Sequence, residues 1–98
     1  MNLFLVENKA TRRRFIAMTA ASISRYRHRL HCDARRLRRI DEGSLLGDIA
    51  RHGIENVTIQ LIETCDDAIA FDRREVWIDY FGTLRPAGYN HEKQEVRA

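Results

Sequence analysis

The sequence predicts an α+β domain in which a small three-stranded antiparallel sheet is packed by about three helices, in the order β-β-α-α-β-α. Three observations predict this class. First, two short apolar runs are joined by a polar, turn-like stretch. Second, a long segment then carries apolar residues at helical spacing. Third, a later segment alternates apolar and polar residues before a last helical stretch. With 98 residues, 44% hydrophobic and 32% charged, the chain is expected to form a single globular domain over residues 1–98.

The first two strands are expected near residues 3–7 and 14–18. The run LFLV at residues 3–6 suits a buried strand, and RFIAM at residues 14–18 suits a second one. The segment ENKATRRR between them is polar, so a hairpin is the simplest connection. This hairpin would place the two apolar runs side by side in the sheet.

Two helices are predicted to follow, near residues 20–39 and 44–52. In the first, apolar residues recur at spacings of three, four and seven while arginines occupy the other faces, the apolar positions being Ile23, Tyr26, Leu30, Leu37 and Ile40. The second begins at Ser44, which suits an N-cap, and is closed by Gly53, which suits a C-terminal cap.

The last strand and helix are expected near residues 56–62 and 66–82. Val57, Ile59 and Leu61 alternate with polar positions, as in a half-buried strand. Acids at 66 and 67 favour the positive end of a helix, which Gly82 and Pro86 would end. The predicted core consists of apolar residues from all these elements: Phe4, Phe15, Ile23, Leu30, Ile49, Ile59, Leu61, Phe71, Ile78 and Phe81.

Charge is distributed unevenly along the chain. Residues 12–39 hold ten arginines and one acid, which leaves +9, whereas residues 40–98 hold twelve acids and six bases, which leaves −6. Such a field is expected of a surface that binds phosphate, so DNA or RNA is the predicted partner, and an acidic protein or a merely solvated helix face is the alternative. The candidate binding residues are the ten arginines: Arg12, Arg13, Arg14, Arg25, Arg27, Arg29, Arg35, Arg36, Arg38 and Arg39.

Other classes of function find little support in the sequence. The longest uncharged run, residues 15–24, is too short and polar to cross a bilayer, and the N-terminus lacks the apolar core of a signal peptide. We therefore expect a cytoplasmic protein without a membrane partner, in which Cys32 and Cys65 are reduced thiols. The histidines near Cys32, His28 and His31, lack the paired spacing of zinc sites.

Two passages, together with the element order and the basic first helix, resemble the GIY-YIG nuclease domain. ARHGIENVTIQLIET, residues 50–64, is similar to the family's yG-x-enF-x-i-x-il-e, and VWIDYFGTLRPAGYN, residues 76–90, is similar to its yWI-x-x-l-x-t-x-p-x-GYN. Either passage alone would be a weak signal, but together they are fairly specific. The resemblance covers nearly the whole chain and implies the fold described above.

The N-terminal motifs of that family are altered in this chain. The family's first strand carries Gly-Ile-Tyr, its second carries Tyr-Ile-Gly or Tyr-Val-Gly, and an arginine opens the next helix. With Arg25 as that arginine, counting back without gaps places the triplets on residues 2–4 and 15–17. Both tyrosines are then phenylalanine, Phe4 and Phe15, and both glycines are absent.

These changes bear directly on catalysis. The family's tyrosine hydroxyls lie at the reaction centre, and a phenylalanine ring can neither donate nor accept a proton. The family's metal-binding glutamate lies three residues before the tryptophan, where this chain has Arg74; Glu75 is one residue away, a rotation of about 100° on a helix. An arginine would repel a divalent cation, so Glu75 is read as an ion-pair partner and no metal or cofactor is expected. Asn90 matches the last residue of the family's GYN, where it would shape the site or cap the final loop.

The leading hypothesis is a catalytically inactive GIY-YIG-like domain that binds nucleic acid or a protein complex that handles it. Its size and lost chemistry suggest an inhibitor encoded by a phage or mobile element and directed at a restriction or CRISPR-type complex. One alternative is a divergent Mg²⁺-dependent endonuclease that uses Glu75 and Arg25. Another is a protein-binding module whose arginine face meets an acidic partner.

Overall fold

The structure, a computed structural model, describes residues 1–41 and 43–91. The predicted order of strands and helices is confirmed, with one short 3₁₀ helix, η1, in addition. The elements are β1 (Asn2–Asn8), β2 (Arg13–Thr19), α1 (Ile23–Arg35), α2 (Leu45–His52), η1 (Ile54–Asn56), β3 (Val57–Thr64) and α3 (Asp67–Phe81). The α+β class with a three-stranded antiparallel sheet is therefore confirmed.

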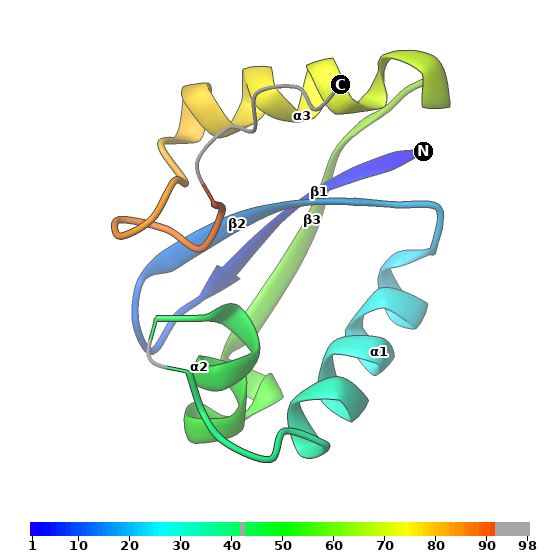
Figure 1. The fold of residues 1–98 in the computed structure, drawn as a ribbon. Helices are drawn as coiled ribbons and strands as arrows, with labels where there is room; N and C mark the ends of the chain where they lie inside the picture. Colours follow the sequence, from blue (N-terminus) through cyan, green and yellow to red (C-terminus); the bar gives the residue numbers. More distant parts are fainter. Residues whose placement is uncertain (42, 92–98) are drawn as a thin grey trace.

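The sheet has β1 at its centre, in the order β2-β1-β3, and both pairings are antiparallel. The predicted hairpin is confirmed, because Phe4 lies opposite Ala17 and Val6 opposite Phe15. Figure 1 shows α3 across one face of this sheet and α1 with α2 on the other. Among the described residues, no helix combines the length and the hydropathy that a membrane crossing would require.

Strand alternation divides the core between these two faces. Phe4 and Val6 pack with Tyr26, Leu30 and other apolar residues of α1 and α2. The neighbouring positions on β1 and β2, among them Leu3, point to the opposite face, which α3 covers with its buried Ala70 and Ile78. Each face thus buries its own layer of side chains.

Three of the predicted core residues are wrong. Leu61 is 48% exposed although it lies opposite the buried Phe4, because it belongs to the edge strand β3. A β-bulge follows it: Leu3 lies opposite Glu63, so Ile62 is left unpaired. Phe71 is 40% exposed, since its neighbour Ala70 takes the buried position on α3.

Ile23 is the third error, with 38% of its surface exposed. The buried residues of α1 are Tyr26, Leu30 and Ala34. At about 100° per residue Ile23 falls on the same side of the helix, but it is the first residue of α1 and lies at the end of the buried row. Helix α1 is also shorter than predicted. It ends at Arg35, and like charges three and four residues apart at positions 35, 36, 38 and 39 disfavour its continuation.

Capping residues explain several of the helix ends. The Ser22 hydroxyl accepts a hydrogen bond from the Arg25 amide, and the Ser44 hydroxyl accepts one from Gly47. Gly82, with φ 64°, adopts the left-handed conformation that ends α3. Asp66 is the N-cap residue of α3, but its side chain makes no cap hydrogen bond.

Candidate nucleic-acid interface

A groove along the outer side of α1 gathers basic side chains. It has a volume of about 640 Å³. Successive helical turns supply its lining, since steps of four and seven residues return to nearly the same side of a helix. The predicted grouping of Arg25, Arg29 and Arg36 on one side is confirmed; the full lining is Ser24, Arg25, His28, Arg29, Cys32, Asp33 and Arg36.

The charge of this groove is little neutralised within the molecule. Arg25, Arg29 and Arg36 are exposed, and within the described part of the chain none of the arginines of α1 belongs to an ion pair. One carboxylate, Asp33, lies in the same lining. The groove therefore presents a net positive surface to solvent, of the kind that attracts phosphate groups.

The remaining arginines of residues 12–39 are placed differently. Arg27 is half-buried and donates from Nη1 to the Val57 carbonyl oxygen at 2.9 Å, which ties α1 to β3. Arg14 lies over the ring of Phe81, 5.5 Å from its centroid, on the side of α3. Arg35, the last residue of α1, is exposed, as are Arg38 and Arg39 after the helix. Arg12 is exposed at the hairpin turn with φ 66°. The positions of these arginines in the sequence do not indicate which of them contact the rest of the fold and which are exposed.

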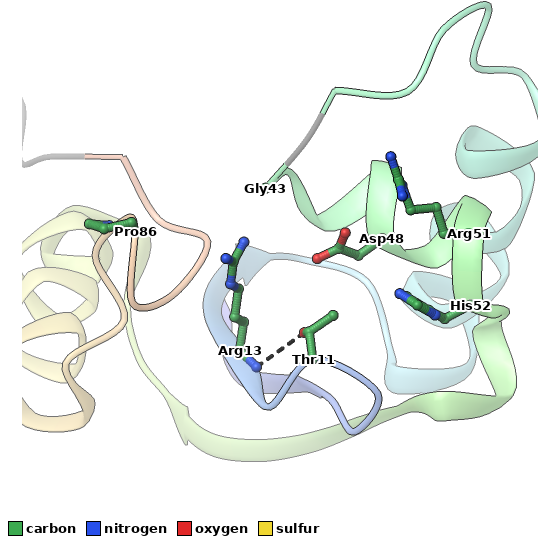
Figure 2. A pocket seen from close by; sticks show the side chains of 7 residues that line it. All are labelled: Thr11, Arg13, Gly43, Asp48, Arg51, His52 and Pro86. Carbon is green, nitrogen blue, oxygen red and sulfur yellow. Dashed lines mark hydrogen bonds between the residues drawn. The ribbon is translucent and has the colours of Figure 1, made fainter.

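A second hollow, of about 450 Å³, lies between the hairpin turn and α2. Figure 2 shows Thr11 and Arg13 entering it from the hairpin, and Asp48, Arg51 and His52 from α2. Gly43 and Pro86 complete the lining. Sequence reasoning missed this site because its residues come from three distant segments and form no motif.

Two residues that line this second hollow, Thr11 and Asp48, are joined by hydrogen bonds to Tyr89. The Tyr89 hydroxyl donates to Asp48 Oδ2 at 2.7 Å and lies 2.8 Å from the Thr11 hydroxyl. Burial, together with the Asp48 carboxylate, raises the pKa of Tyr89 to about 12, although the Thr11 contact opposes this shift. The network joins the loop after α3 to α2 and to the hairpin.

An apolar hollow of about 430 Å³ adjoins the arginine groove. The two share Arg29 and Asp33 in their linings. The apolar side chains that line it come from β2, α1, the loop after α1, α2 and the C-terminal loop: Phe15, Tyr26, Leu30, Leu37, Leu45, Leu46 and Tyr89. Burial raises the pKa of Tyr26 to about 12, and its ring packs on Phe4 with centroids 5.6 Å apart. Tyr26 is thus a core residue, whose ring also forms part of the wall of this hollow.

The positions that the GIY-YIG resemblance would assign to catalysis lie on two faces of the sheet. Phe4 is buried and Phe15 is half-buried on the side of α1 and α2, and Arg25 lies in the groove. Arg74 and Glu75 belong to α3 on the other face of the sheet, and neither lines the groove or the apolar hollow. Their side chains form an ion pair, Arg74 Nη1 to Glu75 Oε2, at 3.2 Å.

Asn90 has a structural role in the loop that follows α3. It is fully buried, and its Oδ1 accepts from the Ile16 amide at 2.8 Å and from the Thr83 hydroxyl at 2.7 Å. Its Nδ2 donates to the Ile16 carbonyl oxygen at 3.2 Å. The side chain of Asn90 therefore attaches the final loop to the edge strand β2.

Metal-ligating groups are sparse in the part of the chain that the structure describes. No group of three or more His, Cys, Asp or Glu side chains is placed to hold an ion there. Cys32 Sγ lies 3.4 Å from His28 Nε2, and both Cys32 and Cys65 are free. A pair of ligands without further donors does not make a zinc site.

Comparison of the chain with protein-family models, with curated proteins and with solved structures finds no match.

Proposed function

We propose that this protein binds nucleic acid through the arginine groove of α1, as a catalytically inactive relative of the GIY-YIG nucleases. The observation that carries the proposal is the set of Arg25, Arg29 and Arg36 along one side of a helix, which are exposed and belong to no ion pair among the described residues. Phosphate contacts by such arginines carry no sequence information, so the binding is expected to have little sequence preference.

The absence of catalysis is supported by the chemistry at the corresponding positions. Phe4 and Phe15 carry no hydroxyl to activate water. The Glu75 carboxylate is engaged by Arg74, and a hard cation usually needs one or two carboxylates in addition to the phosphates of its substrate. The protein should therefore leave plasmid and single-stranded substrates intact in Mg²⁺ or Mn²⁺, and cleavage that disappears in Glu75→Ala would restore the nuclease hypothesis.

A pair of matched double variants tests the binding. Arg25→Ala with Arg29→Ala removes two charges from the groove, and Lys9→Ala with Arg85→Ala removes two exposed charges elsewhere. Affinity for a fluorescent oligonucleotide is measured by anisotropy over a series of salt concentrations. For single strands each lost phosphate contact should flatten the slope of log K against log salt by about 0.7, so the groove variant should lose about 1.4 and the control variant almost nothing.

The outcomes separate the partners. If the wild-type protein binds neither DNA nor RNA at low salt, nucleic-acid binding is rejected. The same arginines would then be tested in a pull-down with and without nuclease treatment. A protein retained after nuclease treatment and lost in the groove variant would support a protein complex, such as a restriction or CRISPR-type assembly, as the partner.

A further inference from the structure

The apolar hollow beside the groove has apolar side chains that the described residues leave partly exposed. Phe15, Leu37 and Leu46 line it and are only half-buried, although Tyr26 and Leu30 behind them are buried. Its volume of about 430 Å³ lies within the range of about 300–1,000 Å³ that small-molecule sites occupy. The hollow is therefore large enough for one flat, mostly apolar group.

The position of the hollow beside the arginine groove indicates which chemical group it could accept. Arg29 lines both the hollow and the arginine groove, so a phosphate held in the groove would place the attached nucleoside at the entrance of the hollow. Two carboxylates, Asp33 and Asp41, also line the hollow. They would repel a phosphate inside it, but they can accept hydrogen bonds from the amino group of a base.

We propose that this hollow accepts one unpaired nucleobase, so that the protein prefers single-stranded nucleic acid to duplex. The inference rests on the nucleic-acid binding proposed above and adds the kind of strand that is bound. Aromatic side chains, here the half-buried Phe15, favour the face of a base and tolerate different bases. In a duplex the bases are stacked and paired, and a base must first be unpaired before it can enter such a hollow.

The first test needs no variant. Three fluorescent probes of equal length are compared at one salt concentration: a single strand, its duplex, and a single strand with abasic sites in place of its bases. The abasic strand keeps the phosphates and loses the bases. We expect the intact single strand to bind about tenfold more tightly than either of the others, since one stacked base is worth a factor of that order.

The second test fills the hollow. Leu37→Trp places a large side chain at a half-buried position of the lining, and Leu61→Trp is the matched control at an exposed position outside it. Leu37→Trp should abolish the tenfold preference and leave duplex affinity and the salt slope unchanged, whereas Leu61→Trp should change none of them. Circular dichroism and thermal melting confirm folding, and Leu46→Trp replaces Leu37→Trp if that variant fails to fold.

The outcomes distinguish this inference from the proposed function. Equal affinity for all three probes overturns the base site and leaves phosphate binding by the groove intact. Absence of binding to every probe rejects both. If Leu37→Trp weakens capture of a protein and leaves single-strand affinity unchanged, the hollow takes an apolar protein side chain, and the nucleobase is excluded.

Discussion

Helices α1 and α3 lie on opposite faces of one sheet and both carry arginines, but they use them differently (Figure 1). On α3, Arg73 Nε donates to both oxygens of Glu63 on β3, at 2.9 and 3.1 Å, and Arg74 pairs with Glu75. On α1, Arg27 donates to the backbone carbonyl oxygens of Ile54 and Val57. The other arginines of α1 belong to no ion pair among the described residues.

This difference continues into the loop after α3. Tyr89 and Asn90 direct their polar atoms inward, to Asp48, Thr83 and the backbone of Ile16. We infer that α3 and its loop stabilise the domain and that α1 is available to a partner. The number of arginines on a helix does not show whether they stabilise the fold or face a partner. Their hydrogen bonds and ion pairs within the fold do. Substitutions on the two sides should therefore affect different measurements.

The largest effect on stability is expected at Asn90. Asn90→Ala leaves the buried Ile16 amide and carbonyl without their side-chain partner, and unsatisfied groups of this kind cost roughly 1–3 kcal/mol each. We expect the free energy of unfolding, measured by urea denaturation, to fall by about 3 kcal/mol. Asn56→Ala, which removes one hydrogen bond to the His52 carbonyl oxygen, is the matched control and should cost about 1 kcal/mol. Equal costs for the two would mean that Asn90 does not anchor the loop.

A smaller loss is expected for Tyr89→Phe. The change removes the hydroxyl that donates to the buried Asp48 carboxylate and should lower the free energy of unfolding by about 2 kcal/mol. The control is Tyr80→Phe, which should leave the free energy of unfolding almost unchanged because the Tyr80 side chain is 74% exposed. Because the pKa of Tyr89 is raised from 10.0 to about 12, the folded state holds this proton more tightly. The stability it contributes is present below pH 10 and is lost as the pH rises toward 12. Wild-type stability should thus fall more steeply than that of Tyr89→Phe in this range.

The smallest effect is expected at Glu63. Hydrogen bonds from Trp77 and then Arg73 lower the pKa of this carboxyl below its ordinary value of 4.5. The stability that the ionised Glu63 carboxylate contributes is present above pH 4.5 and is lost as the pH falls through the lowered pKa. Glu63→Gln should weaken the acid dependence of unfolding without altering oligonucleotide affinity. A change in affinity equal to that of Arg25→Ala would contradict the separation of roles between the two sides of the sheet.

Much of the fold could be predicted because its signals are local. Serine and glycine at helix ends, and apolar residues repeating along strands and helices, act within a few residues of one another, so the element order and most bounds were correct. The grouping of Arg25, Arg29 and Arg36 was also predictable, since the turn of one helix decides it. The resemblance to the GIY-YIG family stays a prediction.

The remaining features depend on contacts between distant segments. The bulge at Ile62 arises from the register of β3 on β1, and the exposure of Leu61 arises from its place on an edge strand. Arg27 and Arg14 differ from the arginines of the groove because tertiary packing places them against β3 and Phe81. The apolar hollow likewise forms only where five segments of the chain pack together. The sequence determined which side chains are available and their local spacing. The folded chain decided which of them are paired internally, because pairing depends on distances that no local pattern encodes.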